Sequence, residues 1–399
     1  MPALPPTLKY ADFRVLLASA VFAGVGFRGQ LVAVGWVLLE KSDSPLIVGL
    51  GIGAFLAPNA FLGIFGGAVT DRLDRRLVMR WASVGLSLNT LVLGVLLLQS
   101  IEIWQVVLLT MTGGAMWSIL QTGAQSYTFD VVGAEDVARG LALTTLALRV
   151  GGVAGALGAG AALSVWGPGE TYIALAAAHF LSALTILLAK TRGQAAPAAL
   201  TPLWQNLREY AGELRRNRTL AWLIVLMVAA EIFGFSHYSA LPILIRDELG
   251  GDGSDLGVAS ALASLAGIFA ILLFSARSGL GSTGIAFLAV MFCYGVSVIA
   301  LGQTEALVTA MVVAAVASGV ASICDVQSQV LVQVAVPNEM RGRAMGTWAL
   351  ALGTGPLGHL QMGALISVFG VATALAINGC ALIVSALAAA ILVGRIRRL

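Results

Sequence analysis

The sequence predicts an all-α membrane protein with twelve transmembrane helices in two six-helix bundles. Three observations support this fold class. Of the 399 residues, 58% are hydrophobic and only 11% are charged, which is more apolar surface than one soluble core can bury. The apolar residues gather in runs long enough to cross about 30 Å of hydrocarbon as helix. The basic residues fall almost entirely in alternate joints between those runs.

The apolar runs form two sets of six. The first set covers residues 13–39, 46–70, 76–99, 103–131, 138–166 and 171–190. The second set covers residues 219–245, 255–276, 282–302, 305–334, 342–369 and 371–394. Turn-forming joints such as Gly167-Pro168-Gly169 separate neighbouring runs, and the alternation typical of barrel strands is absent. Helices are therefore the predicted spanning element, because lipid offers no partners to backbone polar groups.

The basic residues predict the orientation of the chain. If both termini are cytoplasmic, 19 of the 23 Lys and Arg residues lie in cytoplasmic joints, two lie outside and two fall within spans. The two outside are Lys41 and Arg246. Basic residues are retained on the cytoplasmic side of bacterial membranes, so we expect cytoplasmic N- and C-termini. The start of the chain lacks a short apolar segment with a cleavage site, so the first run is expected to stay in the mature protein.

One long polar interruption divides the chain into related halves. We expect a first six-helix bundle over 1–190, a cytoplasmic linker over 191–218 and a second bundle over 219–399. Two dipeptides recur across the linker at a displacement of 202 positions. These are Gln125-Ser126 with Gln327-Ser328, and Arg139-Gly140 with Arg341-Gly342. Dipeptides can match by chance, but the agreement with the two sets of six favours parallel halves related by an axis along the membrane normal.

The sequence shows no sign of an enzyme. Cys293, Cys324 and Cys380 stand singly in apolar runs, and neither HExxH nor a P-loop motif occurs. A membrane-embedded enzyme would need clustered catalytic groups, whereas the three histidines are scattered. The net charge of +3 is too small to suggest nucleic acid. We therefore expect no cofactor, no metal site and no nucleic-acid partner.

The joint between the second and third spans contains the most specific motif. It reads Gly67-Ala68-Val69-Thr70-Asp71-Arg72-Leu73-Asp74-Arg75-Arg76 and resembles the GxLaDrxGrk loop of the major facilitator superfamily. Asp74 stands where that family usually has glycine. The resemblance implies a transporter fold and a latch that closes the cytoplasmic side between the halves. The residues assigned to this cytoplasmic gate are Gly67, Asp71, Arg72, Arg75, Arg76, Arg139 and Arg341.

A second segment narrows the resemblance. Residues 336–346, with the later Gly355-Pro356-Leu357-Gly358, are similar to the loop after the tenth span in the enterobactin-exporter and macrolide-efflux branch. This branch implies export of siderophores or amphipathic drugs driven by proton entry. The arginine-plus-glycine pattern of the drug exporters' fourth span is missing, which weakens a generic drug-efflux function.

Four ionisable residues fall inside predicted spans, where a charge costs on the order of 3 kcal/mol. Arg28 and Arg149 lie in the first half, and Glu231 and Asp325 lie in the second. A guanidinium recognises carboxylate bidentately, so we expect the two arginines to bind an anionic group of a substrate. Pairing with an acid merely to hold helices together is the alternative for each arginine.

Polar stripes mark the fourth and tenth spans. Ser118, Gln121, Gln125 and Thr128 recur at helical spacing in the fourth, and Ser318, Ser322, Asp325, Gln329 and Gln333 do so in the tenth. Such stripes should face a water-filled cavity between the halves. The predicted substrate-binding residues are Arg28, Arg149, Gln121, Gln125, Gln329, Tyr238 and His359.

Proton coupling is assigned to Glu231, Asp325 and His237. A carboxylate in apolar surroundings binds a proton more readily, and histidine titrates near neutrality. A lone membrane histidine is more often only a hydrogen-bonded contact between helices, and that alternative stays open.

The sequence thus predicts a secondary active transporter working by alternating access in the inner membrane of a bacterial cell. It is expected to be a monomer that exports a small amphipathic or anionic molecule, such as a siderophore or drug, in exchange for protons. The alternatives are a proton-coupled uptake permease for an organic anion, because direction depends on coupling rather than fold, and a membrane-embedded enzyme or a channel.

Overall fold

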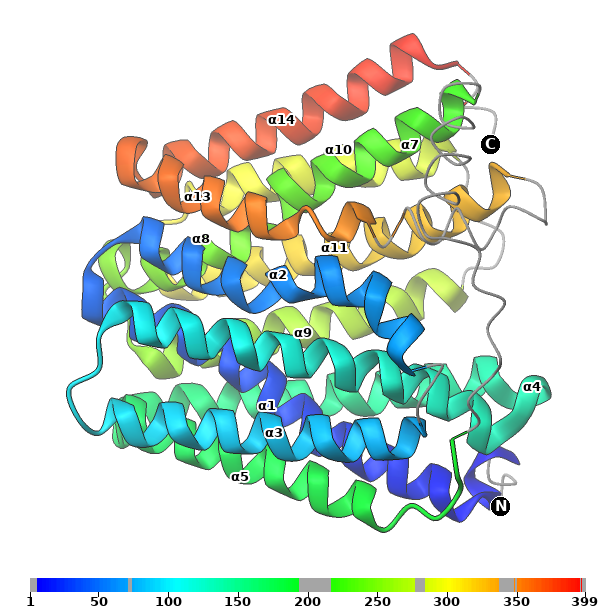
Figure 1. Ribbon diagram of the computed structural model, residues 1–399. Coiled ribbons are helices and arrows are strands. Elements are labelled where there is room, and N and C mark those ends of the chain that lie inside the picture. The colour runs from blue at the N-terminus through cyan, green and yellow to red at the C-terminus, as the bar shows by residue number, and fades with distance from the viewer. Residues whose placement is uncertain are drawn as a thin grey trace. The chain divides into compact units, whose positions relative to one another are not determined.

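The computed structural model describes residues 6–70, 74–193, 217–276, 284–336, 350–394, Trp348 and Ile396, and within them every regular element is a helix (Figure 1). The side chains of residue 6, residue 61, residues 63–70 and residues 275–276 are not described. In this part of the chain, nine helices are long and apolar enough to cross a membrane. The all-helical class is therefore as predicted.

The helices form two compact units that do not follow the two halves of the chain from end to end. Unit 1 consists of Met1–Ser42, Ala54–Ala198 and Asp252–Ala261. Unit 2 consists of Asp43–Gly53, Ala199–Gly251 and Leu262–Leu399. Unit 1 therefore includes about ten residues from the second half of the sequence, and unit 2 includes about ten residues from the first half. Helix α2, Pro45–Thr70, and helix α9, Gly253–Ala276, are each shared between the units.

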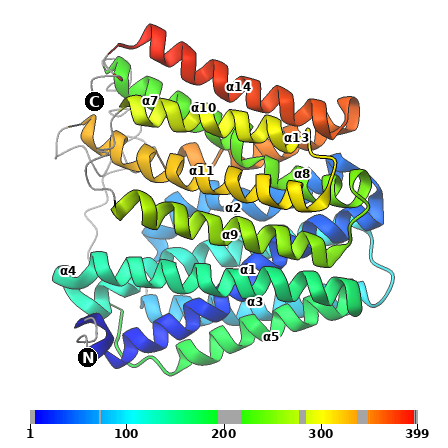
Figure 2. The same cartoon turned by 180° about the vertical axis from the view of Figure 1, so that it is seen from behind.

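Unit 1 is built on four helices that pack side by side. They are preceded by the short 3₁₀-helix η1, Pro6–Lys9, and are α1, Ala11–Ser42; α3, Arg75–Leu97; α4, Ile103–Val165; and α5, Pro168–Leu187. Helix α1 lies against α4 and α5, and α3 also lies against α4 and α5 (Figures 1 and 2). Large apolar side chains on the outside of these helices remain exposed, including Trp81 at 75%. Such outward faces suit contact with lipid.

Helix α4 covers two of the predicted spans in one 63-residue element. The predicted turn between residues 131 and 138 is instead a break at Gly133, whose φ of 77° is non-helical. Glycine adopts this conformation without a side-chain penalty, so the chain bends there while helical hydrogen bonding resumes on both sides. The next turn, before α5, also uses a left-handed glycine, Gly167 with a φ of 98°, followed by Pro168 at the first helical position.

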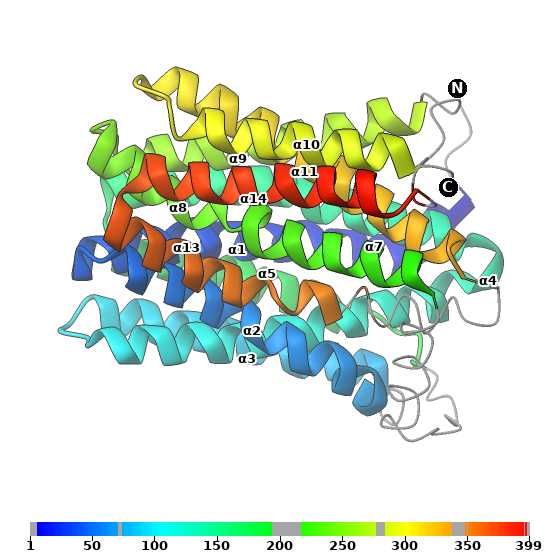
Figure 3. The same cartoon turned by 90° about the horizontal axis from the view of Figure 1, so that it is seen from above.

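Unit 2 contains shorter and more interrupted helices. Its elements are α7, Arg218–Ala229; the π-helix η2, Ala230–Phe235; α8, His237–Ile243; the π-helix η3, Leu244–Glu248; α10, Gly284–Leu301; α11, Leu307–Val334; α13, Gly355–Phe369; and α14, Val371–Leu392. Helix α14 lies along α10 and also contacts α7, α8 and α13 (Figure 3).

The seventh predicted span is not the uniform helix that its hydropathy predicts. It passes from α7 through η2 into α8 and then into η3. Each π-helical segment holds an extra residue in the turn, which leaves the backbone less regularly paired and is frequent at functional sites. Pro242 within α8 adds to the interruption, because it has no N–H to donate.

The eleventh predicted span is also interrupted. Residues 350–352 are helical, a turn follows at Gly353 and Thr354, and α13 begins at Gly355. The turn is closed by the Thr354 N–H, which donates to the carbonyl of Ala351 at 2.9 Å, and Pro356 stands in the first turn of α13. A new helix, α13, thus begins within the range 342–369 that the sequence predicts as one helix.

Candidate functional site

Unit 1 places its two intramembrane arginines on helices whose backbones touch. A Cβ atom at Gly151 would overlap the carbonyl oxygen of Val21, and one at Gly155 would overlap that of Val25. Only glycine permits this close approach of α1 and α4. The arginines are therefore held by helices that cannot move apart without losing a continuous contact.

Arg28 lies on α1 and Arg149 lies on α4, the two helices that form this contact. The side chain of Arg28, on α1, crosses α4 at Gly152, where a Cβ would lie 2.8 Å from the Arg28 Cγ. Arg149 stands three residues before Gly152, on the same face of α4. Both side chains are partly buried. The structure thus places Arg28 against α4 about one helical turn from the position of Arg149.

A cavity of about 60 Å³ lies nearby in unit 1, with room for a few water molecules. Gln121 and Gln125 line it together with Ser19, Thr144 and Thr145, and Trp117 forms part of its apolar wall. Two members of the predicted polar stripe on the fourth span therefore share one cavity. The other two, Ser118 and Thr128, are buried.

Unit 2 brings its two intramembrane carboxylates together. Glu231 on η2 and Asp325 on α11 line one cavity of about 10 Å³, large enough for about one water molecule. Phe235, Phe287 and Trp348 supply aromatic walls, and Ser328 a hydroxyl. The Gln329 amide donates to Asp325 Oδ2 at 3.4 Å, so this predicted substrate residue lies beside the carboxylate pair.

The two histidines of unit 2 are buried and hydrogen-bonded, His237 within its own span and His359 to a neighbouring helix. His237 Nδ1 bonds the carbonyl of Gly234 at 2.8 Å, which fixes its proton on Nδ1. His359 Nδ1, on α13, pairs with the Ser239 hydroxyl at 2.7 Å. The Tyr238 hydroxyl donates to Ser318 Oγ at 3.3 Å. These partners hold α8 to α11 and α13, and they follow Glu231 along the same interrupted span.

The predicted gate residues of unit 1 have partners within that unit. Arg75 Nη1 lies 2.8 Å from Asp130 Oδ1, with side-chain exposures of 11% and 3%, so this ion pair is buried. Arg139 is exposed and lies 3.6 Å from Asp136. Gly67 lies in α2, while Asp71, Arg72 and Arg341 fall outside the described residues. The latch between the halves stays a prediction.

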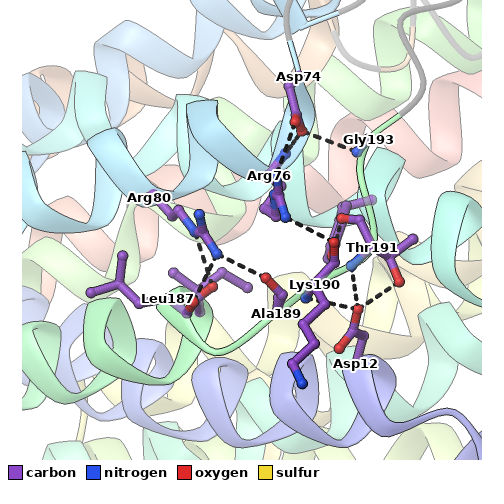
Figure 4. A network of polar contacts seen from close by, with 11 residues as sticks. Asp12, Asp74, Arg76, Arg80, Leu187, Ala189, Lys190, Thr191 and Gly193 are labelled. Atoms are coloured by element: carbon purple, nitrogen blue, oxygen red, sulfur yellow. Dashed lines mark hydrogen bonds and ion pairs between the residues drawn. The ribbon is translucent and has the colours of Figure 1, made fainter.

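Arg76 belongs to a network that fastens residues 186–193, which we call the α5 exit segment (Figure 4). Arg76 Nη1 donates to the carbonyl of Lys190 at 2.8 Å. Arg80 Nη2 donates to the carbonyls of Leu187 and Ala189, at 2.7 and 2.8 Å. These bonds satisfy carbonyls at the C-terminal end of α5, where helix partners are missing.

Two carboxylates complete the network around the α5 exit segment (Figure 4). Asp12 Oδ2 accepts the backbone N–H groups of Lys190 and Thr191 and the Thr191 hydroxyl. Asp74 Oδ1 accepts the N–H of Gly193 at 3.0 Å and that of Arg76 at 3.0 Å. Asp74 is therefore the N-cap of α3, which gives a physical reason for an aspartate at this position.

Sequence reasoning did not assign a role to Asp12 or Asp130. The signal was present, because both carboxylates stand at the ends of apolar spans, on the side where the arginines gather. Hydropathy could not pair them, since Asp130 is 55 positions from Arg75 and Asp12 is 179 positions from Thr191. Among the described residues, no group of three or more His, Cys, Asp or Glu could hold a metal ion.

The transmembrane secretion effector family, a branch of the major facilitator superfamily, matches residues 3–397 of the sequence. This chain belongs to that family. The resemblance read from the loop motifs is thereby confirmed. The family and the fold are those of transporters, so the protein is a multi-pass membrane transporter of the major facilitator type with a small-molecule substrate.

Known relatives are distant. The staphyloferrin A transporter of Staphylococcus aureus (strain NCTC 8325 / PS 47) is 22% identical over 355 residues, which cover 87% of this chain and 88% of that protein. A peptide transporter POT in complex with sulfate superposes with a TM-score of 0.78 at 13% identity, covering 98% of this chain and 95% of that one. A bacterial homologue of the human lysosomal transporter Spinster, in its inward-facing, unoccupied conformation, gives 0.73 at 17%, covering 99% and 97%. These structural matches establish the fold alone.

Proposed function

We propose that this transporter exports a small anionic, amphipathic molecule of the siderophore type in exchange for protons, by alternating access in a bacterial inner membrane. The observation that carries the proposal is the shared cavity of Glu231 and Asp325. Two carboxylates on different helices, set among aromatic side chains, disfavour being ionised together, so one site readily takes up a proton and gives it back. A transporter that only facilitated diffusion would have no use for such a pair.

The arginine pair of unit 1 supports an anionic substrate. Arg28 lies against Gly152 of α4, three residues along the same helix from Arg149, and a guanidinium stays charged even in apolar surroundings. The neighbouring cavity offers amide and hydroxyl groups from Gln121, Gln125 and Thr144 beside the indole of Trp117. Together they suit a molecule that has carboxylates, hydrogen-bonding groups and an apolar part. The relative that transports staphyloferrin A is consistent with this class.

The remaining parts of the proposal concern topology. Twelve spans with cytoplasmic termini, a monomeric state and a cytoplasmic gate at the loop between α2 and α3 follow from the charge asymmetry and the family motif. The α4 break at Gly133 supports counting that helix as two spans.

The test uses purified protein in proteoliposomes loaded with staphyloferrin A as the probe. Acidifying the outside should accelerate efflux of the probe, because inward proton movement is exchanged for outward substrate movement. Glu231→Gln and Asp325→Asn should remove this acceleration but still exchange internal for external probe. Glu305→Gln, at an exposed position outside this cavity, is the matched control and should behave as wild type.

The outcomes separate the competing functions. Acceleration that persists in both carboxylate variants refutes the proton-coupling assignment. Probe accumulation driven by the same inward proton gradient identifies an uptake permease instead. Flux that neither saturates with probe concentration nor responds to the pH gradient identifies a channel.

A further inference from the structure

The carboxylate of Glu231 lies directly against the beginning of α13. A Cβ atom built on Gly355, the first residue of α13, would lie 3.2 Å from Glu231 Oε2. Apart from its chain neighbours and the backbone of its own helix, no other heavy atom of the described residues lies within 4 Å of it. One turn further along, a Cβ on Gly358 would lie 2.9 Å from the Glu231 carbonyl oxygen and 2.6 Å from that of Ile232. Two glycines thus allow α13 to pack closely on η2.

Both elements in this contact are interrupted helices. Glu231 belongs to a π-helical segment, and α13 starts beside it after the turn at Gly353 and Thr354. At the start of α13, Pro356 has no N–H, and the N–H groups of Leu357 and Gly358 donate to the carbonyl of Thr354. The attraction on an anion there comes from the Gly355 N–H and from the partial positive charge at the beginning of the helix. Within the described part of the chain, no hydrogen bond or ion pair from a side chain reaches the Glu231 carboxylate.

Among the described residues, the titratable groups near Glu231 come from the elements packed around η2. Helix α11 contributes Asp325 and Cys324, and α10 contributes Tyr294. His237 of α8 is bonded to the carbonyl of Gly234, His359 of α13 is bonded to Ser239, and Cys380 of α14 is exposed. None of these groups carries a permanent positive charge, so within this part of the chain the attraction on an ionised Glu231 comes from the start of α13.

Helix α13 also contacts the segment of α2 that belongs to unit 2. A Cβ at Gly53 would lie 3.0 Å from the carbonyl oxygen of Pro356, and one at Gly363 would lie 2.5 Å from that of Pro45. A Cβ at Gly49 would overlap the carbonyl oxygen of His359. Helix α13 is therefore packed between the Glu231 segment on one side and residues 45–53 on the other.

We propose that Gly355 is the positioning residue for Glu231, and that the start of α13 senses whether this carboxylate carries a proton. The inference rests on the proposed function, in which Glu231 is a proton-binding group. An ionised Glu231 is drawn to the first turn of α13 and holds it on η2. A protonated Glu231 loses that attraction, so α13 is released and its contact with residues 45–53 of α2 is free to rearrange.

The proposal is tested without a substrate, by infrared spectroscopy of the purified full-length protein during a pH titration. The protonated carboxyl band that disappears in Glu231→Gln reports the protonation of Glu231. Gly355→Ala places a methyl group 3.2 Å from Glu231 Oε2, so the carboxylate has to draw back. The substitution should raise the midpoint of this band by about 0.5 pH unit, the size expected for losing one helix-terminus interaction. Glu231→Asp, whose shorter side chain draws back from Gly355, should show a raised midpoint even if Gly355→Ala folds poorly.

The control and the contrary outcomes are distinct. Gly158→Ala adds a methyl group where the described chain leaves open space and should leave the midpoint unchanged. If no Glu231-dependent band titrates between about pH 5 and pH 9, the proposed function itself is overturned. A band that titrates normally but does not move in either Gly355→Ala or Glu231→Asp overturns only the role of Gly355.

A second measurement tests the release of α13. Amide hydrogen exchange is base-catalysed, so it is expressed as protection relative to the intrinsic exchange rate at each pH. Peptides covering Gly355–Phe369 should show less protection below the Glu231 midpoint in the wild-type protein. In Glu231→Gln, which is never ionised, protection should be low at every pH. Protection that is independent of pH in the wild type would contradict the sensing role.

Discussion

The two units differ in how they hold charge inside apolar helices. In unit 1, Arg28 and Arg149 stand on α1 and α4 where the backbones meet over Gly151 and Gly155, and α1 runs unbroken for 32 residues. In unit 2, Glu231 stands in a π-helical segment against a helix that begins beside it. A guanidinium keeps its charge and benefits from a fixed frame, whereas a carboxylate that gains and loses a proton needs surroundings that can respond.

The contrast bears on the predicted repetition of the two halves of the chain. The dipeptides at Gln125 and Gln327 are predicted to occupy corresponding positions, yet Gln125 lines the cavity of unit 1 and Gln327 is buried. The two predicted counterparts therefore differ in their surroundings. We infer that unit 1 is specialised for holding the substrate and unit 2 for responding to protons.

The largest expected effect concerns the close contact of α1 and α4. Gly151→Val should prevent the two helices from packing, because a side chain there meets the backbone of Val21 rather than a movable side chain. Size-exclusion chromatography of the detergent-solubilised protein should show aggregate instead of a monodisperse peak. Gly158→Val should remain monodisperse, and a well-folded Gly151→Val would show that unit 1 is not the rigid frame described.

The next effect concerns the buried ion pair of unit 1. Asp130→Asn leaves Arg75 without its carboxylate in a buried setting and should destabilise the protein by about 3 kcal/mol. Thermal unfolding in detergent measures this loss. Asp136→Asn, which disturbs the exposed pair with Arg139, should change stability by less than about 0.5 kcal/mol. Equal effects would mean that burial does not distinguish the two pairs.

A smaller effect is expected for the substrate arginines. Arg28→Gln and Arg149→Gln should each lower staphyloferrin A transport by about tenfold or more, the usual loss for one charged partner of a carboxylate, while the thermal midpoint changes little. Arg14→Gln, at an exposed position near the start of α1, should transport normally. Loss of stability together with unchanged specific activity would favour the structural alternative for these arginines.

The smallest effect tests whether unit 1 also responds to protons. His179 Nε2 bonds Gln30 Oε1 at 3.1 Å, and Gln30 Nε2 in turn donates to Thr90 Oγ1 at 2.9 Å. His179→Leu should cost roughly 1 kcal/mol of stability and leave the pH dependence of transport unchanged. A shifted pH dependence would place a proton-sensitive group in unit 1 and break the division of roles.

Much of the fold follows from composition, and less of the site does. Apolar runs and basic joints predict membrane helices because lipid requires internally paired backbone, and the left-handed residues Asp43 and Gly167 lie in joints read from the sequence. The helix interruptions at Glu231 and Gly355 were not predicted. Hydropathy depends on composition, whereas a helix interruption is a change in the backbone hydrogen-bond pattern. The pairing of Glu231 with Asp325 and of Arg75 with Asp130 depends on tertiary packing, which no spacing in one sequence supplies.

The α5 exit segment is one of two attachments that flank the connection between the halves of the chain. Gly193 is held by Asp74, and at the far end the Asn217 amide donates to the carbonyl of Ala335 at 3.2 Å while its side chain caps α7. Each of these ends is thus fastened within its own unit. A protease site inserted between Gly193 and Asn217 should therefore leave both attachments intact after cleavage, with little change in the thermal unfolding midpoint.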